Sequence, residues 1–394
     1  MPAASETRNP KSEKIPNQRC PKVGSPGSAR PPLPAVSTAP RPGGTPFALL
    51  LLAALLAEPT TAQVLTLTNQ HMDIRLQYHP AASGTNRLHL VLGVDPGPVL
   101  LSNHQFYITA HTNAQRIIPA NPNFAFLGPA GAPVWILPQT QDPLRPYLGV
   151  SAEDLSPADF DSPMRLELVG VEGPGNFFAY SVSGAGHPPD VKMIFTNGVV
   201  SPNHYFTTEI VGSHSHNNWA FSTNGLYRVT FRAVGAPPGA GTNLVGRDVA
   251  FAFQLLPLRP WESWVSTNWL PATPGAITGP AADPDGDGVV NAMEYALGLA
   301  PNLPSTNGLP FASLITTNGQ TFGALTFTRV KTATDLVYEP TVRASLAAEN
   351  GTLLTNLVRV LDQGATEQVT VRDHQPADAA NARFFQLRVR LNYP

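Results

Sequence analysis

The chain has 394 residues, enough for two or three domains of ordinary size. Charged residues make up only 13% of it, whereas 42 Pro and 32 Gly interrupt it, so short strands with many turns are favoured and a helical bundle or coiled coil is excluded. The formal net charge is −2 and no dense basic patch follows the N-terminal tail, which argues against nucleic acid as a partner. The one cysteine, Cys20, excludes an internal disulfide and a Cys-based zinc site, so any metal must be held by His and carboxylates.

The first 62 residues have the composition of a leader. Residues 1–46 contain 11 Pro and almost no large apolar residue, so we expect them to be disordered; a start codon assigned too far upstream would explain their length. Residues 47–57 (FALLLLAALLA) form an apolar run shorter than the about 20 residues that span a bilayer, and Thr60 and Ala62 resemble a signal-peptidase site. We predict a signal peptide over residues 47–62 and export to the cell surface, the envelope or the medium; a buried core helix is the alternative.

The predicted mature chain is mildly acidic. Removing residues 1–62 takes away seven basic and three acidic residues, which leaves 18 basic against 24 acidic groups. No second apolar run of about 20 residues follows, so we expect no integral membrane segment in the mature chain.

Alternation of polar and apolar residues predicts β-strands from residue 64 to about residue 258. In His71 to Tyr78 and in residues 227–232 every second side chain is apolar, as in strands with one buried and one solvated face. Further candidate strands are residues 165–171, 176–182, 191–196 and 248–256. The Asn-Gly pairs typical of hairpin turns are Asn197-Gly198 and Asn224-Gly225. We predict an antiparallel β-sandwich over residues 64–258, with a Pro-rich excursion (residues 119–163) carried between strands.

The rest of the chain divides into a linker and a smaller domain. Residues 259–303 hold a short helix-like segment with three Trp, a Pro/Gly/Ala stretch, an acidic loop and one helix at residues 290–297. Strand patterns return over residues 304–394, with Asn307-Gly308, Asn318-Gly319 and Asn350-Gly351 as turn signals. The predicted fold class is therefore all-β, with two antiparallel β-sandwich domains joined by a short helical, calcium-loop linker.

Residues 283–294 (DPDGDGVVNAME) match the spacing of a calcium-binding loop. A hard cation prefers six to eight oxygen ligands, and Gly288 allows the tight turn that aims alternate side chains inward. The predicted calcium ligands are Asp283, Asp285, Asp287, the backbone carbonyl of Val289, Asn291 and Glu294. No helix is expected to enter the loop, so a lone structural calcium site is favoured over a paired EF-hand sensor; a solvated acidic turn is the alternative. The segment DPDGDGVVNAMEYALGLAP resembles the dockerin-like or thrombospondin type 3-like loops that precede a terminal β-domain in secreted Verrucomicrobia-type proteins.

A second candidate site contains histidine. His71 and Asp73 are two residues apart, as are His214 and His216, and residues two apart in a strand project to the same side. Two such pairs on adjacent strands would offer three imidazoles and a carboxylate, a sufficient ligand set for Zn²⁺ or Mn²⁺. Solvated polar faces, or histidines within a buried hydrogen-bond network, are the alternatives.

A resemblance to a known family favours the metal interpretation. The segments GAPVWILPQTQ (131–141) and SHSHNNWAFSTNGLYRVTF (213–231) resemble the surface-anchored domain of the choice-of-anchor M type, known from actinobacterial wall-attached proteins, over residues 64–256. Members share a His-x-Asp strand and an H-x-H-x-N-W-A-F segment, which fall here on His71, Asp73, His214, His216, Asn218 and Trp219. Some relatives are encoded beside metal-chelate transporters, so the resemblance implies a metal-linked role.

The sequence carries no pattern typical of a catalytic site. It has no G-x-S-x-G elbow, P-loop, H-E-x-x-H motif or dinucleotide fingerprint. The favoured interpretation is a secreted, non-enzymatic surface or envelope protein that binds divalent metal ions. The alternative is a carbohydrate-binding or adhesion module that meets envelope or polysaccharide components, and a metal-dependent enzyme is a third. Trp135 and Trp219 are expected to be core residues and not ligand-stacking ones.

Overall fold

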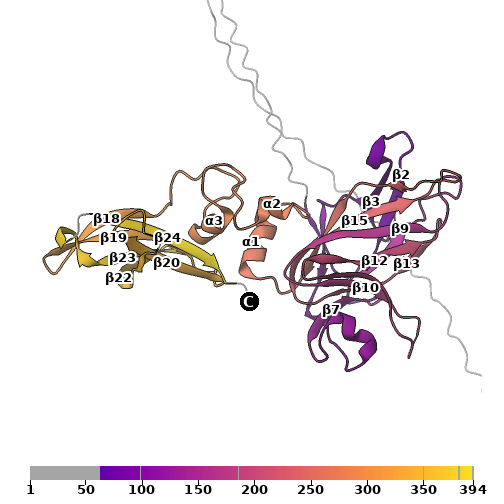
Figure 1. Cartoon of the computed structure of the whole chain (residues 1–394), viewed down its shortest axis with the longest axis horizontal. Helices are drawn as coiled ribbons and strands as arrows, with labels where there is room; N and C mark the ends of the chain where they lie inside the picture. The colour runs from indigo at the N-terminus through magenta and orange to yellow at the C-terminus, as the bar shows by residue number, and fades with distance from the viewer. Residues whose placement is uncertain (1–62, 98, 185, 349, 380–381, 393–394) are drawn as a thin grey trace, which may run out of the picture. The chain divides into compact units, whose positions relative to one another are not determined.

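The computed structural model describes residues 63–97, 99–184, 186–348, 350–379 and 382–392 (Figure 1). The predicted leader (1–46) and signal peptide (47–62) lie outside these residues. The described chain is all-β, as predicted, with three short α-helices confined to residues 260–297. None of the helices in this part of the chain is long and apolar enough to cross a membrane.

In the described part of the chain, seventeen strands precede the first α-helix. They are β1 (Leu65–Leu67), β2 (His71–Tyr78), β3 (Leu88–Val94), β4 (Val99–Leu101), β5 (Phe106–Ala110), β6 (Gln115–Ile117), β7 (Pro133–Leu137), β8 (Tyr147–Ser151), β9 (Met164–Glu172), β10 (Phe177–Ser181), β11 (Asp190–Thr196), β12 (Val199–Glu209), β13 (His214–His216), β14 (Asn218–Phe221), β15 (Gly225–Gly235), β16 (Leu244–Val245) and β17 (Val249–Leu255). Short 3-10 helices lie between some of them: η1 (Gly84–Arg87), η2 (Thr112–Ala114) and η3 (Pro122–Leu127).

These strands form two sheets around one core. A 12-stranded sheet has the order β1-β5-β17-β15-β9-β12-β11-β10-β14-β7-β6, with β16 beside β15, and a five-stranded sheet has the order β13-β8-β2-β3-β4. Apolar residues of both sheets share a single buried cluster, in which Ile74 of β2 and Phe231 of β15 are fully buried. The alternation seen in the sequence explains this packing, because the apolar face of β2 turns to the core and leaves His71 and Asp73 on the polar face.

The structure corrects two expectations for this region. Pairing is not purely antiparallel, because β1 with β5, β5 with β17 and β2 with β8 are parallel. The segment 119–163 is not only an excursion, because it contains β7 and β8. Its Pro and Gly residues separate strands that are too short to show a clear alternation of polar and apolar residues. One of these strands, β8, lies between β13 and β2 at the candidate metal site.

Three helices and two further sheets follow. The helices are α1 (Pro260–Asn268), α2 (Gly275–Thr278) and α3 (Asn291–Leu297). The strands are β18 (Phe311–Thr317), β19 (Gln320–Val330), β20 (Leu336–Arg343), β21 (Thr352–Leu353), β22 (Asn356–Asp362), β23 (Thr366–Pro376) and β24 (Phe384–Leu391), with η4 (Ala377–Ala379) before the last strand. They form a four-stranded sheet, β18-β19-β23-β22, and a three-stranded sheet, β21-β20-β24, whose apolar side chains share one core with Leu297 of α3.

Of the hairpin turns predicted at Asn-Gly pairs, two are present and one is not. Asn197 and Gly198, with φ of 54° and 78°, join β11 to β12, which pair antiparallel; Asn318-Gly319 joins β18 to β19 in the same way. The left-handed backbone that such turns require explains both pairs. The hairpin expected at Asn224-Gly225 is wrong, because it connects β14 to β15 and these strands pair with other partners.

Candidate metal centre

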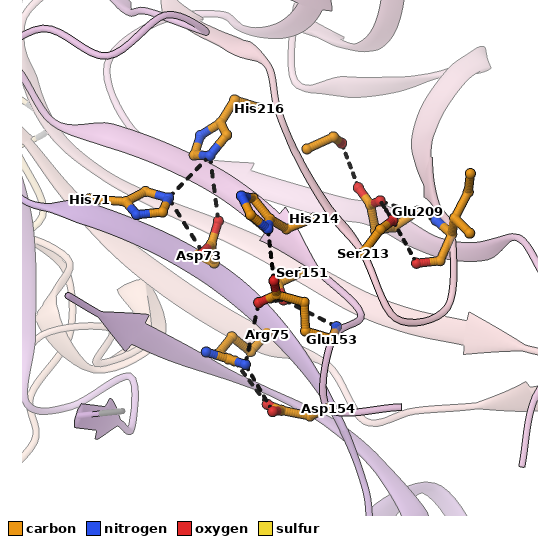
Figure 2. A network of polar contacts seen from close by, with 12 residues as sticks. His71, Asp73, Arg75, Ser151, Glu153, Asp154, Glu209, Ser213, His214 and His216 are labelled. Carbon is orange, nitrogen blue, oxygen red and sulfur yellow. Dashed lines mark hydrogen bonds and ion pairs between the residues drawn. The ribbon is translucent and has the colours of Figure 1, made fainter. Parts of the chain in front are cut away.

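The two predicted histidine segments lie on either side of one strand. β8 pairs with β2 through Asp73 opposite Gly149, and with β13 through His216 opposite the same Gly149. β2 and β13 are therefore not adjacent, as the sequence suggested, but one strand apart, at a Cα separation of about 10 Å. Long side chains can meet across that gap because all of them project from one face of the sheet (Figure 2).

The four predicted side chains converge at this point. His71 Nε2 lies 3.2 Å from His216 Nε2 and 3.6 Å from Asp73 Oδ2, and His216 Nε2 lies 3.9 Å from Asp73 Oδ1. One ring nitrogen each of His71, His214 and His216 falls within 4.8 Å of the others. The 3.2 Å separation is close to the about 3.3 Å between two nitrogens of a tetrahedral site with zinc–nitrogen bonds of about 2.05 Å.

A glycine makes the space for this convergence. A Cβ added to Gly149 would lie 2.2 Å from Asp73 Oδ1 and 2.8 Å from His216 Cε1. Any other residue at this position would displace the side chains of both flanking strands. A glycine inside a short strand such as YLGVS is a sequence signal that other side chains come close to the backbone there.

Two carboxylates orient the rings from outside the cluster. His71 Nδ1 donates to Asp95 Oδ2 at 2.7 Å and His214 Nδ1 donates to Glu153 Oε1 at 2.9 Å. An imidazole whose Nδ1–H donates to a carboxylate keeps the Nε2 lone pair for a ligand. The sequence analysis missed both residues, because each follows a strand in a turn and neither stands at a recognisable spacing from a histidine.

Burial keeps the inner imidazole neutral and leaves an oxygen of the inner carboxylate without a partner. Burial, helped by the neighbouring His71 and His214, lowers the pKa of His216 to about 4, so its imidazole is neutral near pH 7. Burial also raises the pKa of Asp73, which His71 and His214 partly oppose. Asp73 Oδ1 is buried without a hydrogen-bond partner among the described residues. A buried carboxylate oxygen with no donor is costly, and a cation would supply the missing interaction.

Further side chains hold the two segments in place. The ring of Tyr147 stacks on His216 with centroids 3.7 Å apart and an interplanar angle of 5°. On the opposite face of β13, Ser213 and Ser215 both donate hydrogen bonds to the buried carboxylate of Glu209. These contacts fix the His-x-His segment before any ion binds, which reduces the entropy cost of assembling a site.

The arrangement is a set of three imidazoles and one carboxylate, partly open to solvent. The His214 side chain is 39% exposed, whereas that of His216 is 8% exposed. Imidazole and carboxylate donors of this number suit Zn²⁺ and Mn²⁺. The described residues could therefore hold one divalent ion with access from the His214 side.

The predicted calcium loop adopts a curled conformation. Gly286 and Gly288 have φ of 75° and 88°, and carboxylate oxygens of Asp283, Asp285 and Asp287 lie within 4.8 Å of one another. Backbone amides of the loop donate to these carboxylates, for example Gly288 N to Asp283 Oδ2 at 3.0 Å. The positive φ values explain why glycine occupies both positions.

Two further predicted ligands present unpaired oxygens at this loop. Glu294 is completely buried, and neither of its carboxylate oxygens has a hydrogen-bond partner among the described residues. Burial and the nearby Asp285, Asp287 and Asp283 raise its pKa to about 7. Asn291 donates from Nδ2 to the carbonyls of Ile277 and Gly279, and its buried Oδ1 is also unpaired. A solvated acidic turn does not explain a buried, unpaired carboxyl group, whereas a cation does.

Two tryptophans considered as ligand platforms belong to the core. Trp135 is 6% exposed and Trp219 is completely buried, with its Nε1 donating to the carbonyl of Leu148 at 2.8 Å. Neither ring can stack on a ligand from solvent. The expectation that both are core residues is confirmed.

A search against protein-family models found no match for this chain, and a search of curated proteins found none either. The resemblances to the choice-of-anchor M domain and to dockerin-like loops therefore stay predictions from the motifs quoted above. The chemistry of the two clusters carries the functional argument.

Proposed function

We propose that this protein is a secreted, non-enzymatic surface or envelope protein that binds a divalent transition metal ion, Zn²⁺ or Mn²⁺, through His71, Asp73, His214 and His216. The observation that carries the proposal is the convergence of side chains from β2 and β13 across Gly149 of β8. His71 and His216 are 145 residues apart in the chain. A merely solvated polar face would not require a glycine at the one position that faces both strands.

The outer contacts support the same function. Asp95 and Glu153 bind the Nδ1 atoms of His71 and His214, as carboxylates do beside metal-bound histidines. Export follows from the apolar run at residues 47–57 and the small residues before Gln63, which are the basis for the proposed location. Calcium at residues 283–294 is proposed as a structural ion, with Glu294 as its buried ligand.

Metal analysis of the purified protein tests the transition-metal site. We expect about one Zn²⁺ or Mn²⁺ per chain after dialysis, measured by mass spectrometry separately from calcium. The double variant His71→Ala, His216→Ala should lose this ion and keep its calcium. The control is His111→Ala, an exposed histidine outside the cluster, which should bind as the unaltered protein does. Retention of the full transition-metal content in the double variant would refute the proposal.

A further inference from the structure

A cavity separate from both ion clusters lies where α1 and the segment after it cover one end of the 12-stranded sheet. Its volume is about 420 Å³, which is within the range of about 300–1,000 Å³ typical of small-molecule sites. β5, β9 and β15 supply one side through Tyr107, Glu172 and Arg228, and the other side includes Trp261 and Trp269. Hydrogen bonds attach the covering segment to the sheet, from Arg228 Nη1 to the carbonyl of Thr273 and from Gly275 N to Glu172 Oε2, each 2.9 Å long.

Three hydrogen-bond donors of the lining residues are unused. The Tyr107 hydroxyl forms no hydrogen bond with any residue that the structure describes, although the residue is only 7% exposed. Trp269 Nε1 and Arg228 Nε are buried and also have no partner in the described chain. Buried donors are normally satisfied, so three around one cavity favour a ligand that brings acceptor oxygens.

The charges lining the cavity balance. Two carboxylates, Glu172 and Glu262, and two guanidinium groups, Arg228 and Arg259, belong to residues that line it, and Glu172 forms an ion pair with Arg228. A charged ligand would disturb this balance in a partly buried site. The balance therefore favours a neutral ligand.

The remaining lining is apolar and partly aromatic. The partly exposed ring of Trp269 and the side chains of Leu226 and Val265 border the cavity, and the ring of Trp261 is buried behind them. Flat aromatic faces pack against ligands that are apolar on one side and polar at the rim. A pyranose ring has this form, with C–H groups on its faces and hydroxyl oxygens around its edge.

We propose that this cavity binds a neutral saccharide, whose ring packs against Trp269 while its hydroxyl oxygens accept from Tyr107, Trp269 and Arg228. The site shares no residue with either ion cluster. Saccharide binding is therefore independent of the proposed transition-metal binding at the histidine cluster, and either can fail without the other.

Isothermal titration calorimetry of the full chain with cellotriose, maltotriose, mannotriose and chitotriose tests the proposal. At least one of the four should bind saturably at one site per chain, with the same affinity in the double variant His71→Ala, His216→Ala. Tyr107→Phe removes one hydroxyl, and Trp269→Phe removes the indole N–H while keeping a ring. Each should weaken binding about five- to tenfold, the effect of one hydrogen bond.

The control is Tyr205→Phe, on β12 and outside the cavity lining, which should leave the affinity unchanged. If Trp269→Phe fails to fold, Tyr107→Phe alone decides. The proposal is wrong if none of the four saccharides binds, or if binding is the same in Tyr107→Phe. It is also wrong if naphthol binds in the cavity and no saccharide does, since the site would then take an apolar ligand.

Discussion

Glu153 is not one of the four proposed metal ligands, but it orients one of them, His214. Its carboxylate accepts from His214 Nδ1, and this hydrogen bond lowers the pKa of Glu153 and raises that of His214. The same contact turns His214 Nε2 toward His71 and His216. Glu153 itself is held by Ser151 and lies 3.6 Å from Arg75, so its position does not depend on the ion.

We expect Glu153→Gln to weaken transition-metal binding about 10- to 100-fold, because the amide makes the imidazole less basic and orients it less firmly. The measurement is a competition titration against a coloured chelator at pH 8, where proton competition for the imidazoles is small. Glu167→Gln, which alters an ion pair with Arg165 on β9, is the matched control and should leave the affinity unchanged. Equal affinities in the two variants would show that Glu153 does not position the site.

Asp373 of β23 and Arg383, directly before β24, form an ion pair in the C-terminal region. Asp373 is 1% exposed, and both its oxygens accept from Arg383. Burial acts to raise the pKa of Asp373, but the hydrogen bonds from Arg383 and from the backbone N–H of Gln375 outweigh it, and the pKa is lowered. A lowered pKa in the folded state means that this pair stabilises the fold at neutral pH and ceases to do so as acid protonates the carboxylate.

Arg383→Met leaves this buried carboxylate unpaired and should lower the free energy of unfolding by about 3 kcal/mol at pH 7. The difference from the unaltered protein should shrink as the pH falls, since the variant can protonate Asp373 and the unaltered protein loses its pair. Urea unfolding at pH 7 and pH 4 measures both effects. Arg390→Met removes a more exposed partner, 3.6 Å from Glu339, and should have little effect. If the difference in unfolding free energy between Arg383→Met and the unaltered protein grew toward pH 4, Arg383 would not stabilise the fold through the Asp373 carboxylate.

The strand β8 determines whether the four proposed metal ligands can meet. It lies between β2 and β13 and contributes no ligand, but Gly149 leaves the space in which Asp73 and His216 meet. Gly149→Ala should abolish transition-metal binding while the circular dichroism spectrum stays that of the folded protein. Gly170→Ala on β9, where an added Cβ meets nothing within 4 Å, should bind normally. Full binding by Gly149→Ala would mean that the ligands do not meet over β8.

The same strand shows what sequence could and could not predict. The bounds of β2, His71 to Tyr78, follow from alternation alone, and the spacing of the His and Asp pairs pointed to side chains that lie close together in the structure. β8 was missed because five residues among Pro, Gly and Asp give too little alternation to recognise. Its parallel pairing with β2 crosses a long stretch of chain, and pairing over such distances depends on packing of the whole core, which local pattern does not report.

Both proposed ion sites are held by contacts that form only in the folded chain. The calcium loop is an example, because it is linked to both flanking regions: Asn291 donates to Ile277 and Gly279, and Ser305 N donates to Asp287. The helix that follows carries Tyr295, whose hydroxyl donates to Asp335 Oδ1 at 2.7 Å. An ion that binds only this folded arrangement stabilises it by mass action.

Calcium should therefore raise the melting temperature, and EGTA should lower it by the equivalent of about 3 kcal/mol when calcium had been about 100-fold above its dissociation constant. The stability of Glu294→Gln relative to the unaltered protein should reverse between calcium and EGTA. With calcium it should be less stable than the unaltered protein, because it lacks a charged ligand; in EGTA it should be at least as stable, because a neutral amide removes a buried carboxyl group that three aspartates repel. Differential scanning calorimetry in both buffers measures this reversal.

The reversal separates a calcium ligand from a residue that merely packs. If Glu294 only filled space, Glu294→Gln would shift the melting temperature equally with calcium and with EGTA. Glu339→Gln, a partly exposed position on β20, should follow the unaltered protein in both buffers. An equal shift in the two conditions would remove Glu294 from the ligand set, and its buried, unpaired oxygens would then have to be those of a neutral carboxylic acid.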